Sequence, residues 1–101
     1  MTLYIDTSDL RAATFKLFAG KTTVANSTAV LDPYTSHKLL GHLERFLLGN
    51  GVEVNNKDGS IAAISLFAGE GSHTGLRIGL AIAQGLSLSW NVPIKPTKAK
   101  R

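Results

Sequence analysis

Two polar stretches of the chain contain residue types that could bind a phosphate group. One is the short turn-like run at 6–8, and the other is a glycine-rich stretch at 68–75 that leads into a helical pattern. The N-terminus of a helix offers free backbone N–H groups and the positive end of a dipole, so it attracts anions. The candidate residues of such nucleotide-contacting loops are Asp6, Thr7, Ser8, Gly69, Gly71, Ser72, Thr74 and Gly75.

Other kinds of catalytic chemistry have less support in the residue pattern. The chain has no cysteine, which excludes disulfides and thiolate metal sites. His37 and His42 are five residues apart, so they do not share a helix face as an i, i+4 pair of metal ligands would. Ser72 and His73 are adjacent and belong to no nucleophile-elbow pattern, which argues against a hydrolytic triad with Asp6. We therefore expect no metal site, no cofactor and no catalytic residue.

The elements that would hold the two loops form an α/β pattern. Strands are predicted where β-formers alternate or run continuously, and the third of them is more polar, as an edge strand would be. Two helices are predicted, one from a cap at Thr35 or Ser36 to about Leu48, the other from Thr74 to Ser89. The predicted strands are 2–6, 12–19, 22–30 and 61–67, and a further strand could begin at 92–94.

The order of these elements predicts a particular sheet. The helix between the third and fourth strands crosses over, normally right-handed, and so places the fourth strand parallel to the first. The predicted fold class is α/β, a βββαβα half of a ribonuclease H-like or actin-like (ASKHA) domain with a mixed sheet of strand order 3-2-1-4. Both candidate loops then lie at the carboxyl ends of adjacent parallel strands, where open α/β sheets bind ligands.

Both predicted helices are more apolar than a short chain can easily cover. A surface helix normally has one apolar stripe, whereas apolar residues surround most of the second helix. The two helices could cover each other within one chain, but we favour an interface with another chain, either a homodimer or a hetero-pair. The predicted interface residues are Leu40, Leu43, Leu47, Gly75, Leu76, Gly79, Ala83 and Leu86.

The basic character of the chain is concentrated at one end. The formal net charge is +4, and Lys95, Lys98, Lys100 and Arg101 fall within the last seven residues. We therefore divide the chain into a single domain, 1–94, and a basic tail, 95–101. A solvated, frayed terminus and a weak, salt-sensitive contact with RNA phosphates both fit such a tail. No aromatic residue lies among its basic ones, so base stacking is not expected.

No membrane or export signal is visible in the sequence. The apolar start is interrupted at Asp6, too early for the apolar core of a signal peptide. The longest apolar stretch, 78–90, is short and broken by polar residues and glycine, so we expect no membrane span. The expected compartment is the cytoplasm.

Three segments resemble a known family. Residues 3–8 read Leu-Tyr-Ile-Asp-Thr-Ser and look like the opening of the TsaB (YeaZ) family, the dimerisation subunit of the bacterial machinery that makes threonylcarbamoyladenosine in tRNA. Residues 69–79 read Gly-Glu-Gly-Ser-His-Thr-Gly-Leu-Arg-Ile-Gly and resemble its Gly-Pro-Gly-Ser-Phe-Thr-Gly-Leu-Arg-Ile-Gly. Residues 83–86, Ala-Gln-Gly-Leu, are similar to its Ala-Lys-Gly-Leu. The resemblance is to the N-terminal half of the family.

The resemblance implies an actin-like pseudo-enzyme that works by docking. Such a subunit would pair through its helices with a TsaD-like catalytic subunit, help to recruit a TsaE-like ATPase, and form a homodimer when alone. It would have no ATPase or protease activity of its own. Alternative functions are a nucleotide-binding ASKHA-type ATPase fragment and a basic-tailed RNA-associated protein, which would touch tRNA only weakly. Glu70 and His73 stand where the family has proline and phenylalanine, so this loop departs from the family's pattern at two positions.

Overall fold

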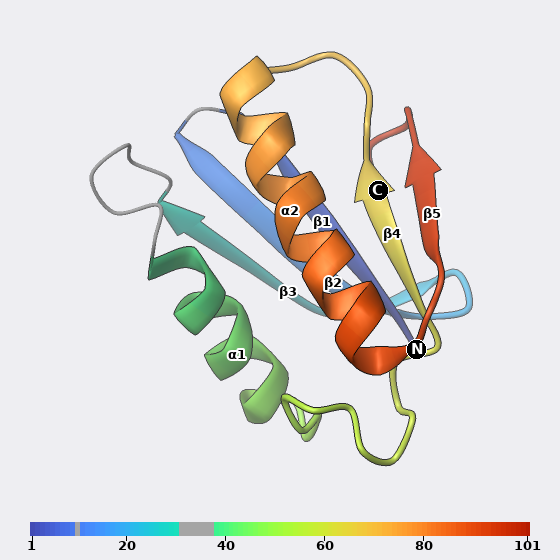
Figure 1. Ribbon diagram of the computed structural model, residues 1–101. Helices are drawn as coiled ribbons and strands as arrows, with labels where there is room; N and C mark the ends of the chain where they lie inside the picture. Colours follow the sequence, from blue (N-terminus) through green and yellow to red (C-terminus); the bar gives the residue numbers. More distant parts are fainter. Residues whose placement is uncertain (10, 31–37) are drawn as a thin grey trace.

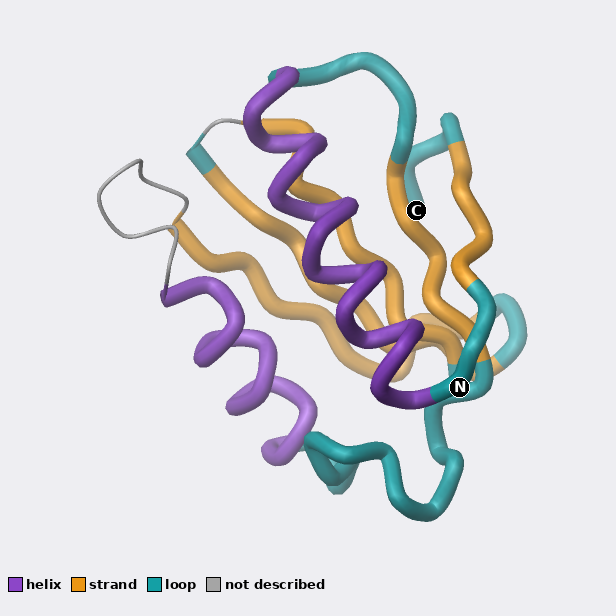
Figure 2. The backbone as a smooth tube through the Cα atoms, viewed as in Figure 1, coloured by secondary structure: helices purple, strands orange, loops and turns teal. Residues whose placement is uncertain are grey.

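The computed structural model describes residues 1–9, 11–30 and 38–101, which form one sheet and two helices (Figures 1 and 2). The predicted element order is confirmed within these residues. The strands are β1 Thr2–Asp9, β2 Ala12–Ala19, β3 Thr22–Val30, β4 Ala63–Phe67 and β5 Ile94–Thr97, and the helices are α1 Leu39–Gly49 and α2 His73–Trp90.

The sheet has the strand order β3-β2-β1-β4-β5. β1 is antiparallel to β2, which is antiparallel to β3, while β1 and β4 are parallel, as are β4 and β5. The predicted order 3-2-1-4 is therefore confirmed, and the strand suggested from 92–94 is β5 at the far edge. Pro96 fits there because an edge strand does not need every backbone N–H for pairing.

β1 is longer than predicted, and this changes the role of the first candidate loop. The strand continues to Asp9, so Thr7 and Ser8 lie in the sheet and not in a turn. The reason is its partner: β2 pairs with β1 up to Asp6↔Thr14, and after an irregularity the pairing resumes at Asp9↔Ala12. A bulge of this kind lets a strand continue past an unpaired position.

Both helices pack on the same face of the sheet and enclose the main core. α2 lies across β1 and β4, while α1 lies beside β3 (Figure 1). The buried aliphatic side chains of the sheet, such as Leu3, Ile5 and Leu17, meet those of both helices in one cluster. No helix of the described residues is long and apolar enough to cross a membrane.

The two helices differ in whether a side chain caps their N-terminal end. α2 begins at the N-cap Ser72, whose Oγ accepts a hydrogen bond from the Gly75 N–H at 3.1 Å. α1 has Lys38 at its N-cap position and no side-chain cap. The expected caps, Thr35 and Ser36, lie outside the described residues, as does His37.

The C-terminal end of α2 is fixed by the only tryptophan of the chain. The Trp90 indole is 8% exposed, and its Nε1–H donates to the Val54 carbonyl at 2.7 Å. The loop that contains Val54 is closed in turn by Asn56, whose side chain exchanges two hydrogen bonds with the backbone of Ile61. The connection from α1 to β4 is thereby attached to the end of α2.

The C-terminal residues are not the frayed tail that the charge pattern suggested. Residues 95–97 belong to β5, and the chain then turns over the face of the sheet that carries no helix. A small aromatic cluster of Tyr4, Phe18 and Phe67 lies on that face. The guanidinium of Arg101 is 4.3 Å from the centre of the Phe18 ring, a cation–π distance. The expectation of a frayed terminus is therefore wrong for these residues, whereas their basic side chains are exposed to solvent, as expected.

The small residues of α2 pack against this chain's own sheet and not against a partner. Gly75, Gly79 and Ala83 are all buried. A Cβ at Gly75 would collide with the Thr7 carbonyl oxygen, and one at Gly79 with Thr7 Oγ1. Leu43 and Leu47 of α1 are also fully buried in the core. These residues are therefore unavailable to a partner, and the interface prediction is wrong for them. Leu40 is exposed, and Leu76 and Leu86 are half-buried.

A test of this close packing is the substitution Gly79→Ala. Alanine favours a helix over glycine by about 1 kcal/mol, but overpacking against β1 costs roughly 1–3 kcal/mol. We therefore expect a net loss of stability in urea unfolding. Gly85→Ala is the matched control, because nothing lies within 4 Å of the position that its Cβ would take. The control should be neutral or stabilising. Equal effects of the two substitutions would contradict the packing described here.

Candidate functional site

The two candidate loops meet, as the parallel pairing of β1 and β4 predicted. The Ser72 N–H donates to the Ser8 carbonyl at 2.8 Å, and Thr7 Oγ1 donates to the Gly75 carbonyl at 2.6 Å. The approach is so close that a Cβ at Gly71 would collide with Ser8. Gly71 and Gly75 therefore serve the contact between β1 and the start of α2.

This contact uses polar groups that a phosphate would otherwise bind. Thr7 is 1% exposed and its hydroxyl is directed at Gly75, while the Ser72 hydroxyl caps α2. Gly69 lies against the Phe67 ring and the backbone of the segment that follows β5. Thr74 is exposed on the first turn of α2. The structure thus brings most of the predicted loop residues together, but largely as partners of one another.

Asp6 points to the opposite face of the sheet and is the centre of a separate polar network. Its Oδ1 accepts hydrogen bonds from the Ser8 N–H at 2.9 Å and the Ser8 hydroxyl at 2.6 Å. Its Oδ2 accepts from the Tyr4 hydroxyl at 3.3 Å and from Lys100 Nζ at 2.9 Å. Lys100 Nζ also donates to Ser8 Oγ at 2.7 Å. Asp6 is thus enclosed by donors from β1 and from the C-terminal segment.

The surroundings of Asp6 shift two pKa values in opposite directions. Burial is the largest single influence on Asp6 and raises its pKa, but the hydrogen bonds from Ser8 and the Lys100 ammonium outweigh it, so the pKa is lowered overall. Burial raises the pKa of Tyr4 to about 12, and the nearby Asp6 carboxylate adds to this effect. At neutral pH Tyr4 is therefore a protonated donor and Asp6 an ionised acceptor.

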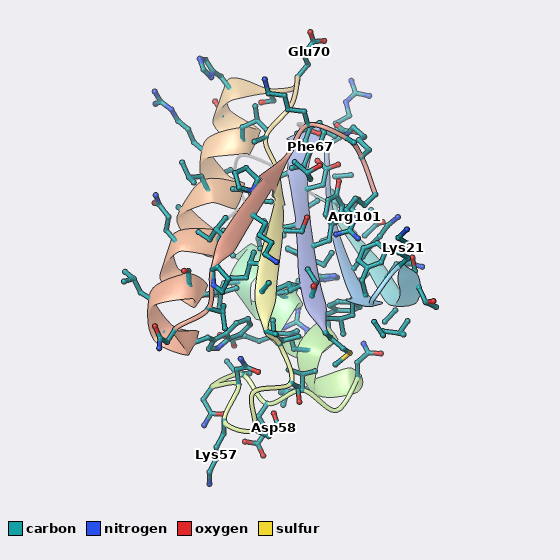
Figure 3. All side chains as sticks on the ribbon, turned by 90° about the vertical axis from the view of Figure 1, so that its right-hand side faces the viewer. Lys21, Lys57, Asp58, Phe67, Glu70 and Arg101 are labelled. Atoms are coloured by element: carbon teal, nitrogen blue, oxygen red, sulfur yellow. The ribbon has the colours of Figure 1, made fainter. Side chains whose placement is uncertain are left out.

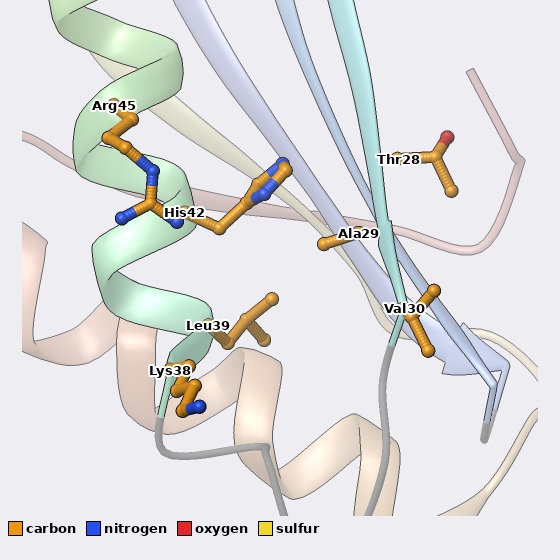
Figure 4. Close-up of a pocket in the computed structure, with 7 residues that line it drawn as sticks. All are labelled: Thr28, Ala29, Val30, Lys38, Leu39, His42 and Arg45. Carbon is orange, nitrogen blue, oxygen red and sulfur yellow. The ribbon is translucent and has the colours of Figure 1, made fainter.

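Two of the pockets in the described residues are lined mainly by polar and charged side chains from the sheet and α1. One, of about 240 Å³, lies on the helix-free face and is lined by residues that include Tyr4, Asp6, Lys16, Lys100 and Arg101. In Figure 3 the Arg101 side chain lies on the side of the sheet away from α2. The other, of about 290 Å³, lies between β3 and α1, and Ala29 of β3 points toward the helix there (Figure 4). Its lining residues are Thr28, Ala29, Val30, Lys38, Leu39, His42 and Arg45.

The sequence reasoning missed the residues that complete the Asp6 network. Tyr4, Asp6 and Ser8 alternate along β1, so they share one face, and this period-2 pattern could have identified them. Lys100 could not have been found in this way, because its contact depends on how the chain turns after β5. Among residues 1–9, 11–30 and 38–101, no group of three metal-ligating side chains lies close together.

The lowered pKa of Asp6 predicts how stability depends on acid. A carboxyl group whose pKa is lower in the folded than in the unfolded protein stabilises the fold above its unfolded pKa, and this contribution is lost as the pH falls through the folded pKa. We expect the free energy of unfolding to decline below about pH 4, near the ordinary aspartate pKa. Asp6→Asn should remove part of this decline.

Urea unfolding at a series of pH values measures this effect. Asp9→Asn is the control, because it changes an exposed carboxylate on the same strand. If Asp6→Asn kept the full acid-dependent loss of the unmodified protein, the Asp6 network would not be the cause.

Comparison with known proteins gives one consistent family. The chain matches no protein-family model. It is 31% identical over 94 residues to the tRNA threonylcarbamoyladenosine biosynthesis protein TsaB of Haemophilus influenzae. The aligned region covers 93% of this chain and 37% of that protein. The resemblance inferred from the motifs is therefore confirmed.

Solved structures show the same fold. YeaZ from Pseudomonas aeruginosa superposes with a TM-score of 0.76 at 25% identity, over 95% of this chain and 42% of that one. A protein described as uncharacterised, with similarity to peptidase YeaZ from Pseudomonas aeruginosa, gives a TM-score of 0.77 with the same identity and coverage. The chain spans about two fifths of the length of the relatives it matches, as expected for a resemblance to one half of them.

Proposed function

We propose that this chain, which resembles TsaB across 93% of its length, is a non-catalytic subunit that supports the synthesis of threonylcarbamoyladenosine in tRNA. It would act in the cytoplasm by docking onto a TsaD-like catalytic subunit, with a TsaE-like ATPase joining the assembly, and would form a homodimer when alone. The observation that carries the proposal is the agreement of sequence and fold with TsaB and YeaZ over nearly the whole chain.

The exposed side chains of the helices support docking. After α1 and α2 have covered the sheet, each still exposes two leucines spaced eight residues apart. This spacing is slightly more than two helical turns, so the members of each pair lie on a similar side of their helix. Large apolar side chains at a surface favour contact with another protein. The exposed fractions are 45% for Leu40, 58% for Leu48, 43% for Leu80 and 85% for Leu88.

The state of the candidate loops supports a non-catalytic role. The Thr7 hydroxyl donates to the Gly75 carbonyl, and the Ser72 hydroxyl caps α2 by accepting from the Gly75 N–H. The Asp6 carboxylate is bonded to Ser8 and Lys100. A nucleotide would have to displace these partners before it could use the same groups.

The predicted docking can be measured by light scattering. The protein alone should have the mass of a dimer, and mixing with a TsaD-type subunit from the same source should convert it into a stoichiometric hetero-complex. The paired substitution Leu80→Asp and Leu88→Asp should weaken association at least tenfold, because it places two charges where apolar contact is expected. Val24→Asp, at an exposed valine of β3, is the control and should associate normally. A protein that stays monomeric and does not bind the TsaD-type subunit would refute the docking proposal.

The absence of catalysis is tested separately with ATP. We expect the purified protein to release phosphate from ATP no faster than a blank, and Asp6→Ala to leave that rate unchanged. Hydrolysis above the blank that Asp6→Ala abolishes would show instead that the chain is an ATPase fragment. The assay needs no partner, so its result does not depend on whether docking occurs.

A further inference from the structure

The helix-free face of the sheet holds a lysine side chain in a defined site. Lys100 Nζ lies 2.9 Å from Asp6 Oδ2, 2.7 Å from Ser8 Oγ and 4.5 Å from the centre of the Phe67 ring. An ammonium group has three N–H donors and a compact charge, and here it finds a carboxylate oxygen, a hydroxyl oxygen and an aromatic face. These contacts satisfy the chemistry of a primary ammonium group.

The residues around the ammonium group are held in place independently of Lys100. Asp6 Oδ1 is fixed by the Ser8 N–H and hydroxyl, and the Tyr4 hydroxyl supports Oδ2. Asp6 is 8% exposed, Ser8 6% and Phe67 4%, and all three belong to the adjacent central strands β1 and β4. The residues that contact the ammonium group are therefore buried residues of the sheet.

Lys100, by contrast, is weakly held. Its side chain is 61% exposed, and it lies beyond the end of the edge strand β5. The segment is held next to the site by Arg101, whose N–H donates to the Tyr4 hydroxyl at 3.3 Å and whose carbonyl accepts from Lys16 Nζ at 2.6 Å. Exposed ion pairs contribute little to stability, because solvent screens them. The site thus belongs to the sheet, whereas the group that fills it comes from an exposed side chain.

We propose that Asp6, Ser8 and Phe67 form a binding site for a primary alkylammonium group, which Lys100 fills from within the chain and which an external amine of the same chemistry can occupy in its place. The ligand is either a lysine side chain of another protein or a small amine. The inference does not depend on the docking function proposed above, because the site lies on the face of the sheet opposite the helices.

The geometry favours this ligand over other cations. A guanidinium binds best to two oxygens of one carboxylate in a fork, but Oδ1 of Asp6 is already occupied by two donors from Ser8. Magnesium requires a near-octahedral set of oxygen ligands, whereas here an aromatic ring takes one side of the site. The amine is therefore the cation whose donors match the acceptors available.

Chemical rescue tests the proposal. In Lys100→Ala, which removes an exposed side chain, the site is vacated and we expect a lower melting temperature. Propylammonium chloride should restore it with a saturable concentration dependence, beyond the effect of equal concentrations of sodium chloride or tetramethylammonium chloride. Lys98→Ala, which removes an exposed lysine two residues away, is the matched control and should gain nothing more from propylammonium than from sodium.

A second variant ties the rescue to the site. In Lys100→Ala combined with Ser8→Ala the propylammonium concentration for half-rescue should rise about tenfold, as expected when a hydrogen bond to a charged group is lost. Rescue of Lys100→Ala by spermidine in preference to Nα-acetyl-lysine amide would identify a small polyamine as the external ligand, and the reverse preference a protein lysine. If propylammonium stabilised Lys100→Ala no more than sodium did, or stabilised the unmodified protein equally, the proposal would be overturned.

Discussion

The contact between the first turns of α2 and the strand β1 is the constraint on which the rest of this structure depends. Gly75 and Gly79 allow the helix to approach Thr7 more closely than any residue with a Cβ could, and the Thr7 hydroxyl then bonds to the helix backbone. This contact determines the direction in which α2 crosses the sheet. It also places the loop after β4 against the end of β1, and so determines the position of every candidate site residue.

The same contact divides the polar groups of β1 between two faces. Thr7 points to the helices and is used for packing, whereas Tyr4, Asp6 and Ser8 point to the other face and form a network of their own. A sequence motif that looks like one phosphate-binding unit therefore separates into a packing residue and an ionic site. Alternation along a strand is sufficient to produce this separation.

Much of the fold could be predicted from the sequence, because local patterns determine it. The bounds of β2 and β3 agree with the predicted 12–19 and 22–30, since a tight turn and alternating β-formers specify a hairpin locally. The crossover rule placed β4 correctly beside β1. The end of β1 could not be predicted, because pairing with β2 continues through residues that read as a turn.

The sites were harder to predict than the fold, because their contacts join residues far apart in the chain. A glycine-rich face on α2 is compatible both with a partner helix and with this chain's own sheet, and only the tertiary structure distinguishes them. The residues that remain exposed, among them Leu48, Leu80 and Leu88, were less conspicuous in the sequence than the glycines. Likewise, the charges of 95–101 indicated a solvated tail, but two of them lie on aromatic rings of the sheet.

The attachment of Trp90 to the loop before β4 gives the molecule a built-in spectroscopic reporter. Because the chain has one tryptophan, its tryptophan fluorescence comes from a single indole that is buried and hydrogen-bonded to Val54. That indole is at the C-terminal end of α2, whereas Ser8 of the Asp6 network contacts Ser72 at the N-terminal end of the same helix. Its emission therefore follows the unfolding of the domain as a whole, and a ligand on the opposite face of the sheet would change the melting curve without quenching the signal directly.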